Sequence, residues 1–338
     1  MRALVWKEIN KVELIENVVK PELKQGYIRI KVKYTCFCGS DMTIVHGRHP
    51  RAKAPLILGH EFMGSIDYLP DDYKGDLIIG QRVTVEPLIA CGECKDCKNG
   101  NNHVCGALKL IGVETDGGFA EYVNAPIDKV FALPDNVSDK EAALIEPAAV
   151  AVHSVDYGRI TTDENVLVMG AGAIGVLIAQ VARLQTKNLY IADVVPERLQ
   201  FAKSLGLNVI DSGKADYREQ LMKITEDKGF DVVFDAAGAP PVAETFIDIT
   251  AIKGRIVITA LYKEPASMLL SQLSYKEQSI FGVRIYAKGD FEKTIALVRD
   301  KKIDIEPLVT RIFDMNDAVA AYEYAEKGGA VFKVLIKQ

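Results

Sequence analysis

The chain has 338 residues, of which 49% are hydrophobic, and a formal net charge of -5 at pH 7. This length and composition predict two globular domains. The acidic balance offers no cationic surface to nucleic acid or anionic lipid. The most apolar run, residues 166–179, is fourteen residues long, whereas a membrane span needs about twenty. We therefore expect neither nucleic acid nor membrane as a partner. Because no secretory leader pattern opens the chain, the cytoplasm is the expected compartment.

The first 140 or so residues alternate short β-type runs with turns. Runs rich in β-branched and aromatic residues occupy residues 2–6, 27–34, 63–68, 82–85 and 121–124. Such runs, separated by turn-forming residues, are typical of strands. This half of the chain is therefore predicted to be mostly β.

Four of the six cysteines lie within fifteen residues, at Cys91, Cys94, Cys97 and Cys105. Glycine, asparagine and aspartate between them favour the tight turns that a tetrahedral zinc site requires. Two disulfides, or a Cys-x-x-Cys redox motif, are the alternatives, but three such thiols in a row with a fourth following fit a metal better. Four thiolates saturate zinc, so this ion would stabilise a lobe and leave no position for a substrate.

From about residue 152 the pattern changes to apolar strands alternating with helices. Strands are predicted at residues 166–169, 189–192, 208–210, 231–235 and 255–259, with helices ending near 184 and spanning 196–205. This alternation favours a parallel sheet covered on both faces. The last fifty or so residues, with a helix at 290–299 and a strand at 331–336, could complete either domain.

A glycine motif follows the first of these strands and opens a helix. It comprises Gly170, Gly172, Ala173, Ile174 and Gly175. Its glycines would allow a tight turn, close approach of a pyrophosphate and close helix packing. Asp193, eighteen residues after Gly175, would bind a ribose 2′-hydroxyl and repel a 2′-phosphate, which favours NAD over NADP. The alternative is an ordinary glycine turn with a helix-capping Asp193. Arg198 could weaken the preference or simply be solvated.

The two remaining cysteines are Cys36 and Cys38, and Cys38 precedes Gly39-Ser40-Asp41. His60 and Glu61 follow a glycine further on. Thiolate, imidazole and carboxylate form a ligand set that a catalytic zinc accepts while keeping one position open. A buried polar histidine and a small buried thiol explain the same residues equally well on chemistry alone.

The order of these motifs resembles that of the zinc-dependent medium-chain alcohol dehydrogenases over nearly the whole chain. The shared segments are residues 38–41, 59–64, 117–122 and 146–147, the four-cysteine motif and the glycine motif. The similarity is greatest to the sorbitol (polyol), threonine, butanediol and sugar-acid dehydrogenases. It implies a GroES-like mostly-β catalytic domain from residues 1–148 and 286–338, a Rossmann domain with a doubly wound parallel sheet from 149–285, and an active site between them.

The resemblance also implies roles for individual residues. Cys38, His60 and Glu61 would bind a catalytic zinc, the second of two per chain. Glu146 would bind that ion or its water and exchange with Glu61. Ser40 would take the proton from the substrate hydroxyl while hydride passes to NAD. The product would be a ketone, and the enzyme would be a homodimer or homotetramer.

Two features leave questions open. Thr43 stands where many relatives have the histidine that completes the proton relay. His46 is the candidate replacement, although we expect a surface role for His46. Arg284 either binds a substrate carboxylate or contacts the cofactor or a partner subunit.

From the resemblance as a whole we expect oxidation of a secondary hydroxyl of a polyol or sugar acid. Oxidation of threonine or butanediol is the alternative, and a non-catalytic NAD-binding protein with a structural zinc is the rival from another class.

Overall fold

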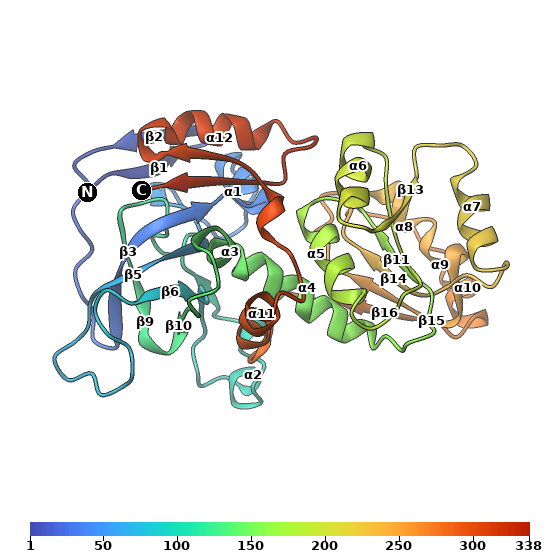
Figure 1. The fold of residues 1–338 in the computed structure, drawn as a ribbon, viewed down its shortest axis with the longest axis horizontal. Helices are drawn as coiled ribbons and strands as arrows, with labels where there is room; N and C mark the ends of the chain where they lie inside the picture. The colour runs from blue at the N-terminus through green and yellow to red at the C-terminus, as the bar shows by residue number, and fades with distance from the viewer. The chain divides into compact units, whose positions relative to one another are not determined.

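The computed structural model describes all residues, 1–338, and they form two compact units. Unit 1 comprises Met1–Pro147 and Ala287–Gln338, and unit 2 comprises Ala148–Tyr286. Both chain ends therefore belong to unit 1 (Figure 1). The chain first passes from one unit to the other within helix α4 (Ile145–Gly158).

Unit 1 is built mainly on a seven-stranded sheet with the order β10-β6-β5-β3-β18-β17, in which β9 also pairs with β3. These strands are β3 (Tyr27–Cys36), β5 (Glu61–Tyr68), β6 (Arg82–Val85), β9 (Tyr122–Pro126), β10 (Val130–Ala132), β17 (Val309–Asp314) and β18 (Lys333–Lys337). A smaller sheet has the order β2-β1-β4, from β1 (Ala3–Glu8), β2 (Lys11–Ile15) and β4 (Leu56–Ile57). Alternate residues of β3, such as Ile28, Ile30 and Val32, are buried in one apolar cluster, as expected for strands with one face in a core.

The C-terminal segment completes the large sheet of unit 1. Strand β18 lies between β3 and β17 (Figure 1), antiparallel to β3 and parallel to β17. In this register Leu335 is opposite Cys36, and Cys36 is opposite Glu61 of β5. Because side chains alternate between faces, Lys333 shares the face of these three residues. Helices α11 (Asp290–Arg299) and α12 (Ala318–Glu326) belong to the same segment.

Unit 2 contains a six-stranded, all-parallel sheet with the order β13-β12-β11-β14-β15-β16. Its strands are β11 (Val166–Met169), β12 (Leu189–Asp193), β13 (Asn208–Asp211), β14 (Phe230–Asp235), β15 (Thr250–Ile258) and β16 (Ser279–Gly282). Helices α5 (Ala173–Ala182), α6 (Pro196–Ser204) and α7 (Tyr217–Ile224) connect successive strands. Counted along the chain, the order 3-2-1-4-5-6 is that of a dinucleotide-binding Rossmann sheet. The expected parallel sheet is confirmed.

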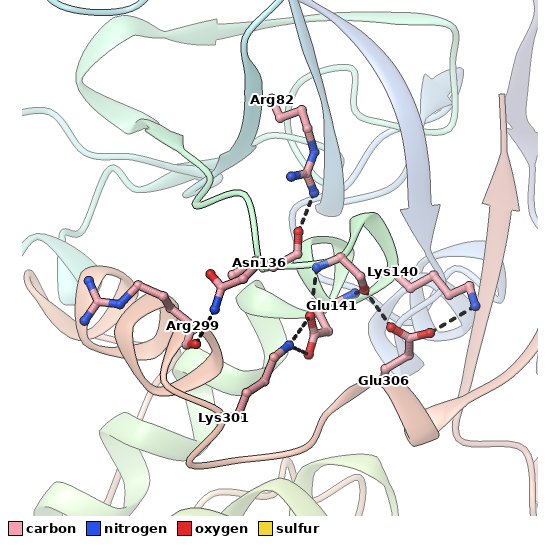
Figure 2. Close-up of polar contacts among 9 residues, drawn as sticks. Arg82, Asn136, Lys140, Glu141, Arg299, Lys301 and Glu306 are labelled. Carbon is pink, nitrogen blue, oxygen red and sulfur yellow. Dashed lines mark hydrogen bonds and ion pairs between the residues drawn. The ribbon is translucent and has the colours of Figure 1, made fainter.

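A network of charged side chains in unit 1 ties the C-terminal segment to helix α3 (Asp139–Ala143) (Figure 2). Ser138 caps this helix by accepting the backbone N–H of Glu141, whose carboxylate in turn accepts the N–H of Ser138. Lys301 donates to both oxygens of Glu141, at 2.7 and 3.0 Å. Glu306 accepts from the hydroxyl of Ser138 at 2.6 Å and from Lys140 at 3.0 Å. The first turn of α4, which carries Glu146, follows α3 directly.

The predicted elements agree with the structure most closely where an apolar run has sharp ends. The strands at 82–85 and 166–169 and the helix at 290–299 have the bounds expected. The strand expected from residue 331 begins at Lys333. No helix in the structure combines the length and apolar character that a membrane crossing requires.

Candidate functional site

The four clustered cysteines converge in unit 1. Cys94 is the N-cap of the short helix α2 (Lys95–Lys98), which carries Cys97, and Cys105 ends a 3-10 turn at Asn102–Val104. Neighbouring sulfurs are 3.5 Å apart for Cys94–Cys97 and Cys91–Cys105, and 3.9 Å apart for Cys91–Cys97 and Cys94–Cys105. All four sulfurs lie within 4.8 Å of one another. Zinc–sulfur bonds of about 2.3 Å in a tetrahedron place sulfurs about 3.8 Å apart, so the donor set fits zinc.

The disulfide alternative for these residues is wrong in this structure. All six cysteines are free thiols, whereas bonded sulfurs would be about 2.05 Å apart. Backbone N–H groups of Glu93 and Cys94 point at the Cys91 sulfur and lower the pKa of that thiol to about 6. A thiolate is the form that binds a metal, so these backbone donors favour the ligating state of Cys91, whereas burial and the neighbouring thiols raise the pKa of Cys97 to about 12.

A second group of possible metal ligands forms elsewhere in unit 1, from Cys38, His60 and Glu61. One donor atom from each lies within 4.8 Å of the others. Cys38 follows the end of β3, and Glu61 begins β5, the strand paired with β3. Cys38 is partly buried, whereas His60 and Glu61 are 5% and 0% exposed. Sheet pairing therefore brings together three residues that span 23 positions of sequence. A thiolate, an imidazole and a carboxylate could hold zinc with one position open.

Helix α1 (Gly39–Val45) fixes the Cys38 end of this group. Cys38 is the N-cap of the helix, and its N–H donates to Oδ2 of Asp41 at 2.8 Å. This carboxylate satisfies a backbone donor at the helix start that would otherwise lack a partner. One residue into the helix, the Ser40 hydroxyl lies 3.3 Å from Nε2 of His60. Ser40 thus borders the imidazole of the candidate ligand group.

The charges around His60 favour binding of a cation. Burial alone would lower the pKa of His60, but the Asp41 carboxylate, the Cys38 sulfur and Glu146 outweigh it and raise the pKa well above its usual value. Burial also raises the pKa of Asp41 to about 6, despite the opposing charge of His60. Several anionic groups around one imidazole stabilise positive charge there, whether carried by a proton or by a metal ion.

Glu61 also has a cationic partner that the sequence did not reveal. The Lys333 ammonium lies 2.5 Å from Oε1 and 2.6 Å from Oε2 of Glu61. Their side chains are 5% and 1% exposed. Burial alone would lower the pKa of Lys333, but Glu61 more than compensates and the pKa is raised. This is a buried, charge-assisted pair formed between residues 272 positions apart.

The other residues expected near this site have mixed positions. Glu146 is 6% exposed and lies outside the three-residue group, although its charge acts on His60. The Thr43 hydroxyl donates to the carbonyl of Gly39 within its own helix. His46 contacts Asn10 through Nδ1 at 2.7 Å and Glu326 through Nε2 at 2.8 Å. The hydrogen bonds and ion pair of Thr43 and His46 described here are thus made with residues other than Ser40.

The glycine motif in unit 2 has the geometry of a phosphate-binding turn between β11 and α5. Gly170 has a φ of +100°, and a Cβ there would lie 2.9 Å from backbone atoms of Ala236 and Ala237. At Gly175 a Cβ would lie 1.7 Å from the carbonyl oxygen of Gly170, so a side chain would separate helix from strand. A Cβ at Gly172, the N-cap of α5, would meet nothing within 4 Å. The turn thus leaves open space at the helix N-terminus, where an anion is favoured.

Asp193 ends β12 beside this turn. Its Oδ2 accepts the N–H of Ala171 at 2.7 Å, and its Oδ1 accepts the N–H of Val195 at 2.9 Å. The side chain is 6% exposed, and the Arg198 guanidinium lies 3.5 Å from Oδ2. The aspartate therefore connects the glycine turn to the end of the next strand, and Arg198 is its neighbour rather than a fully solvated residue.

Asp41 and Lys333 are parts of the site that the residue pattern did not predict, and the pattern gave only weak grounds for Arg284. Asp41 had a usable signal, because it stands three residues after a candidate ligand, which is the spacing of a helix-capping pair. Lys333 had none, because its role depends on the placement of β18. Arg284 is exposed in unit 2 and forms no ion pair in the structure, and no contact there assigns it a role.

Two family models match the chain. The one described as an alcohol dehydrogenase GroES-like domain matches residues 24–135, and the one described as a zinc-binding dehydrogenase matches residues 173–300. The sorbitol dehydrogenase of Halalkalibacterium halodurans is 36% identical over 324 residues, which cover 94% of each chain. The 2-dehydro-3-deoxy-L-galactonate 5-dehydrogenase of Pseudoalteromonas atlantica is 31% identical over 313 residues, which cover 92% of each chain.

A solved structure is similar along the same length. An alcohol dehydrogenase (rspB) of Escherichia coli, crystallised with NADH, is 32% identical and superposes with a TM-score of 0.93, covering 100% of this chain and 99% of that chain. The expected combination of a GroES-like domain and a Rossmann domain is confirmed. Because this similarity extends over almost the whole chain and through both units, the protein belongs to the zinc-dependent medium-chain alcohol dehydrogenase superfamily.

Proposed function

We propose that the protein oxidises a secondary hydroxyl of a polyol or sugar acid to a ketone and transfers the hydride to NAD. The observation that carries the proposal is the convergence of Cys38, His60 and Glu61, with donor atoms within 4.8 Å, in a chain that also has a separate four-cysteine cluster. One cluster is saturated by its own thiolates, so only the other keeps a position for substrate. The general class, an NAD-dependent dehydrogenase of the zinc alcohol dehydrogenase type, follows from family membership.

The reaction needs an acidified hydroxyl and a route for its proton. A zinc ion held by Cys38, His60 and Glu61 would supply a Lewis acid that lowers the pKa of the substrate hydroxyl. Glu146, whose charge already acts on His60, would serve as the alternative carboxylate when Glu61 leaves the metal. The Ser40 hydroxyl, 3.3 Å from His60, would accept the substrate proton while donating its own proton to the next group outward. We propose no residue for the outer end of the relay, since Thr43 and His46 have their recorded contacts elsewhere.

The proposed cofactor contacts lie around the turn of unit 2. Backbone N–H groups from Gly172 to Gly175, including those of Ala173 and Ile174, would receive the pyrophosphate at the start of α5. Asp193 would accept hydrogen bonds from the adenosine ribose hydroxyls and disfavour a 2′-phosphate by like charge. Arg198, 3.5 Å from Asp193, offsets part of that charge. We therefore propose that the protein prefers NAD to NADP because of the Asp193 charge, and that Arg198 reduces this preference.

The substrate class rests on the relatives. The sorbitol and 2-dehydro-3-deoxy-L-galactonate dehydrogenases reported above carry names of a polyol and of a sugar acid. If the substrate carries a carboxylate, the exposed guanidinium of Arg284 would be able to bind it. L-Threonine and 2,3-butanediol are the second candidates, because they offer a secondary hydroxyl to the same zinc and NAD chemistry. We also propose a homodimer or homotetramer, which light scattering of the purified protein would test.

A panel of substrates tests the proposal. The absorbance of NADH is followed with polyols, aldonates, uronate-derived acids, threonine and butanediols, after zinc content has been measured. We expect two zinc ions per chain and turnover of at least one polyol or sugar acid. Cys38→Ser, which removes one proposed ligand, should bind NAD and give no turnover. One zinc ion per chain, retained in Cys38→Ser, together with inactivity on the whole panel, would instead indicate the non-catalytic NAD-binding protein.

A further inference from the structure

Glu61 faces two demands that it cannot meet fully at once. One carboxylate oxygen lies within 4.8 Å of the candidate donor atoms of Cys38 and His60. Both oxygens, however, already accept hydrogen bonds from Lys333, at 2.5 and 2.6 Å. A metal ion and an ammonium would compete for the same oxygen lone pairs.

The fold leaves Lys333 little alternative to this contact. Its side chain is 5% exposed, and Glu61 is the only carboxylate within ion-pair distance of its ammonium. Strand β18 places Lys333 on the same sheet face as Cys36 and Glu61, through the pairing of Leu335 with Cys36 and of Cys36 with Glu61. The Cys36 side chain on that face is itself buried. Lys333 is thus directed at Glu61 by sheet register.

The charges define the consequence. A divalent ion bound by the Cys38 thiolate and the Glu61 carboxylate would be neutralised by those two groups alone, and a buried ammonium next to Glu61 adds one positive charge. In a buried setting such a charge repels the metal and weakens Glu61 as a ligand. Coupling of this kind is reciprocal, so a metal that takes Glu61 must loosen Lys333.

We propose that Lys333 is a positioning residue that holds Glu61 back from the metal at Cys38 and His60 and thereby keeps a coordination position available to substrate. This inference rests on the proposed catalytic zinc. It assigns to a residue near the C-terminus the control of ligand exchange between Glu61 and Glu146. Without Lys333, Glu61 would stay on the metal, and binding of Glu146 beside it would fill the fourth position.

The test measures metal retention and coordination rather than turnover alone. Lys333→Met keeps the apolar stem and removes the charge, Lys333→Arg keeps the charge, and Lys333→Met combined with Glu61→Gln removes both charges. The rate of zinc release to a chromogenic chelator is measured for each protein. Zinc should leave the four-cysteine cluster more slowly, and that second rate serves as an internal reference within the same chain. The visible absorption of the cobalt-substituted site reports the ligand set.

We expect Lys333→Met to release the second zinc about tenfold more slowly, which corresponds to about 1.4 kcal/mol, with a changed cobalt spectrum and a lower kcat. Lys333→Arg should restore release rate and spectrum, and the double variant should lose the added retention. The double variant also guards against misfolding, because it leaves no uncompensated buried charge.

Unchanged zinc release and an unchanged cobalt spectrum in a folded Lys333→Met protein would overturn the inference, as would faster release. So would added retention that persists in the double variant, since it would not act through Glu61. These outcomes differ from failure of the proposed function, in which the unsubstituted protein itself would hold only one zinc ion per chain.

Discussion

Asp41 lies directly behind His60, with its Oδ1 3.5 Å from Nδ1 of the imidazole, and both side chains are buried. The other oxygen of Asp41 accepts the N–H of Cys38. A single carboxylate therefore contacts two of the three candidate zinc ligands. Carboxylates in this position orient a ligating histidine, favour the tautomer with its hydrogen on the nitrogen that faces the carboxylate, and increase the basicity of the other nitrogen.

From this arrangement we predict that Asp41→Asn weakens zinc binding at the second site. The amide can still accept the N–H of Cys38, but it lacks the negative charge that orients His60 and stabilises a cation bound to it. Loss of such a supporting group typically costs about 10- to 100-fold in metal affinity. Titration of the metal-depleted protein with zinc measures the effect. The affinity of the second site is compared with that of the four-cysteine site in the same protein. Equal affinities of the second site in variant and parent would show that Asp41 acts only as a helix cap.

The two cysteine-containing groups should separate in a pair of matched substitutions. Cys38→Ser should lose one zinc ion and all turnover while the free energy of unfolding changes little, since the remaining fold of unit 1 does not depend on an open site. Cys97→Ser should lose the other zinc ion and destabilise the lobe strongly, because structural zinc contributes on the order of 10 kcal/mol in small zinc-binding domains.

Zinc content by mass spectrometry and thermal unfolding of both variants check this prediction. Each variant should retain one zinc ion per chain. If both proteins unfold at the same lowered temperature, the four-cysteine group and the group of Cys38, His60 and Glu61 do not have separate roles as a structural site and a site with an open position.

Local patterns were sufficient to predict the glycine turn between β11 and α5. Gly170, Gly175 and Asp193 occupy the positions that their spacing indicated, because a strand, a tight turn and a helix start are determined by neighbouring residues. The four cysteines near residue 100 converge for the same reason, since short turns leave their sulfurs no other arrangement.

Contacts between distant strands could not be predicted in this way. Lys333 meets Glu61 only because β18 is inserted between β3 and β17, and nothing in the pattern of residues 287–338 indicated which unit they would join. Cys38 and His60 were a plausible pair by residue type alone, and the resemblance to a family supplied what local chemistry left open. Register across a sheet therefore decides the parts of this site that spacing does not.

The cofactor preference should depend on the charge of Asp193. Asp193→Asn keeps an oxygen for the N–H of Ala171 or Val195 and removes the charge that would repel a 2′-phosphate. It also removes the negative charge that lies 3.5 Å from the Arg198 guanidinium. We predict that the ratio of kcat/KM for NAD to that for NADP falls at least about tenfold, or about 1.4 kcal/mol.

Steady-state kinetics with both cofactors measure this ratio. Asp211→Asn is a matched control, because Asp211 ends the neighbouring strand β13 opposite Asp193 and also accepts a local backbone N–H. The prediction fails if the Asp211 and Asp193 variants change the ratio equally.

The network around α3 predicts a pH-dependent contribution to stability. Asp139, in the first turn of α3, contacts Lys33 and accepts a hydrogen bond from Arg82 at 2.8 Å. Burial alone would raise the pKa of Asp139, but these two cations outweigh it and lower the pKa below its ordinary value. A carboxylate with a lowered folded pKa stabilises the protein fully above its unfolded pKa of about 3.9, and that stabilisation is lost as pH falls through the folded value.

We therefore predict that Asp139→Asn lowers the free energy of unfolding by about 1 kcal/mol near pH 7, the scale of a partly exposed ion pair at a helix start. The deficit should shrink as the pH falls below about 3.9 and through the lowered folded pKa of Asp139, because the parent protein then loses the same charge by protonation. Urea unfolding across this pH range measures it, with Asp135→Asn as the control, since Asp135 is exposed and forms no ion pair in the structure. A deficit that stays constant with pH would mean that Asp139 acts through shape or capping and not through its charge.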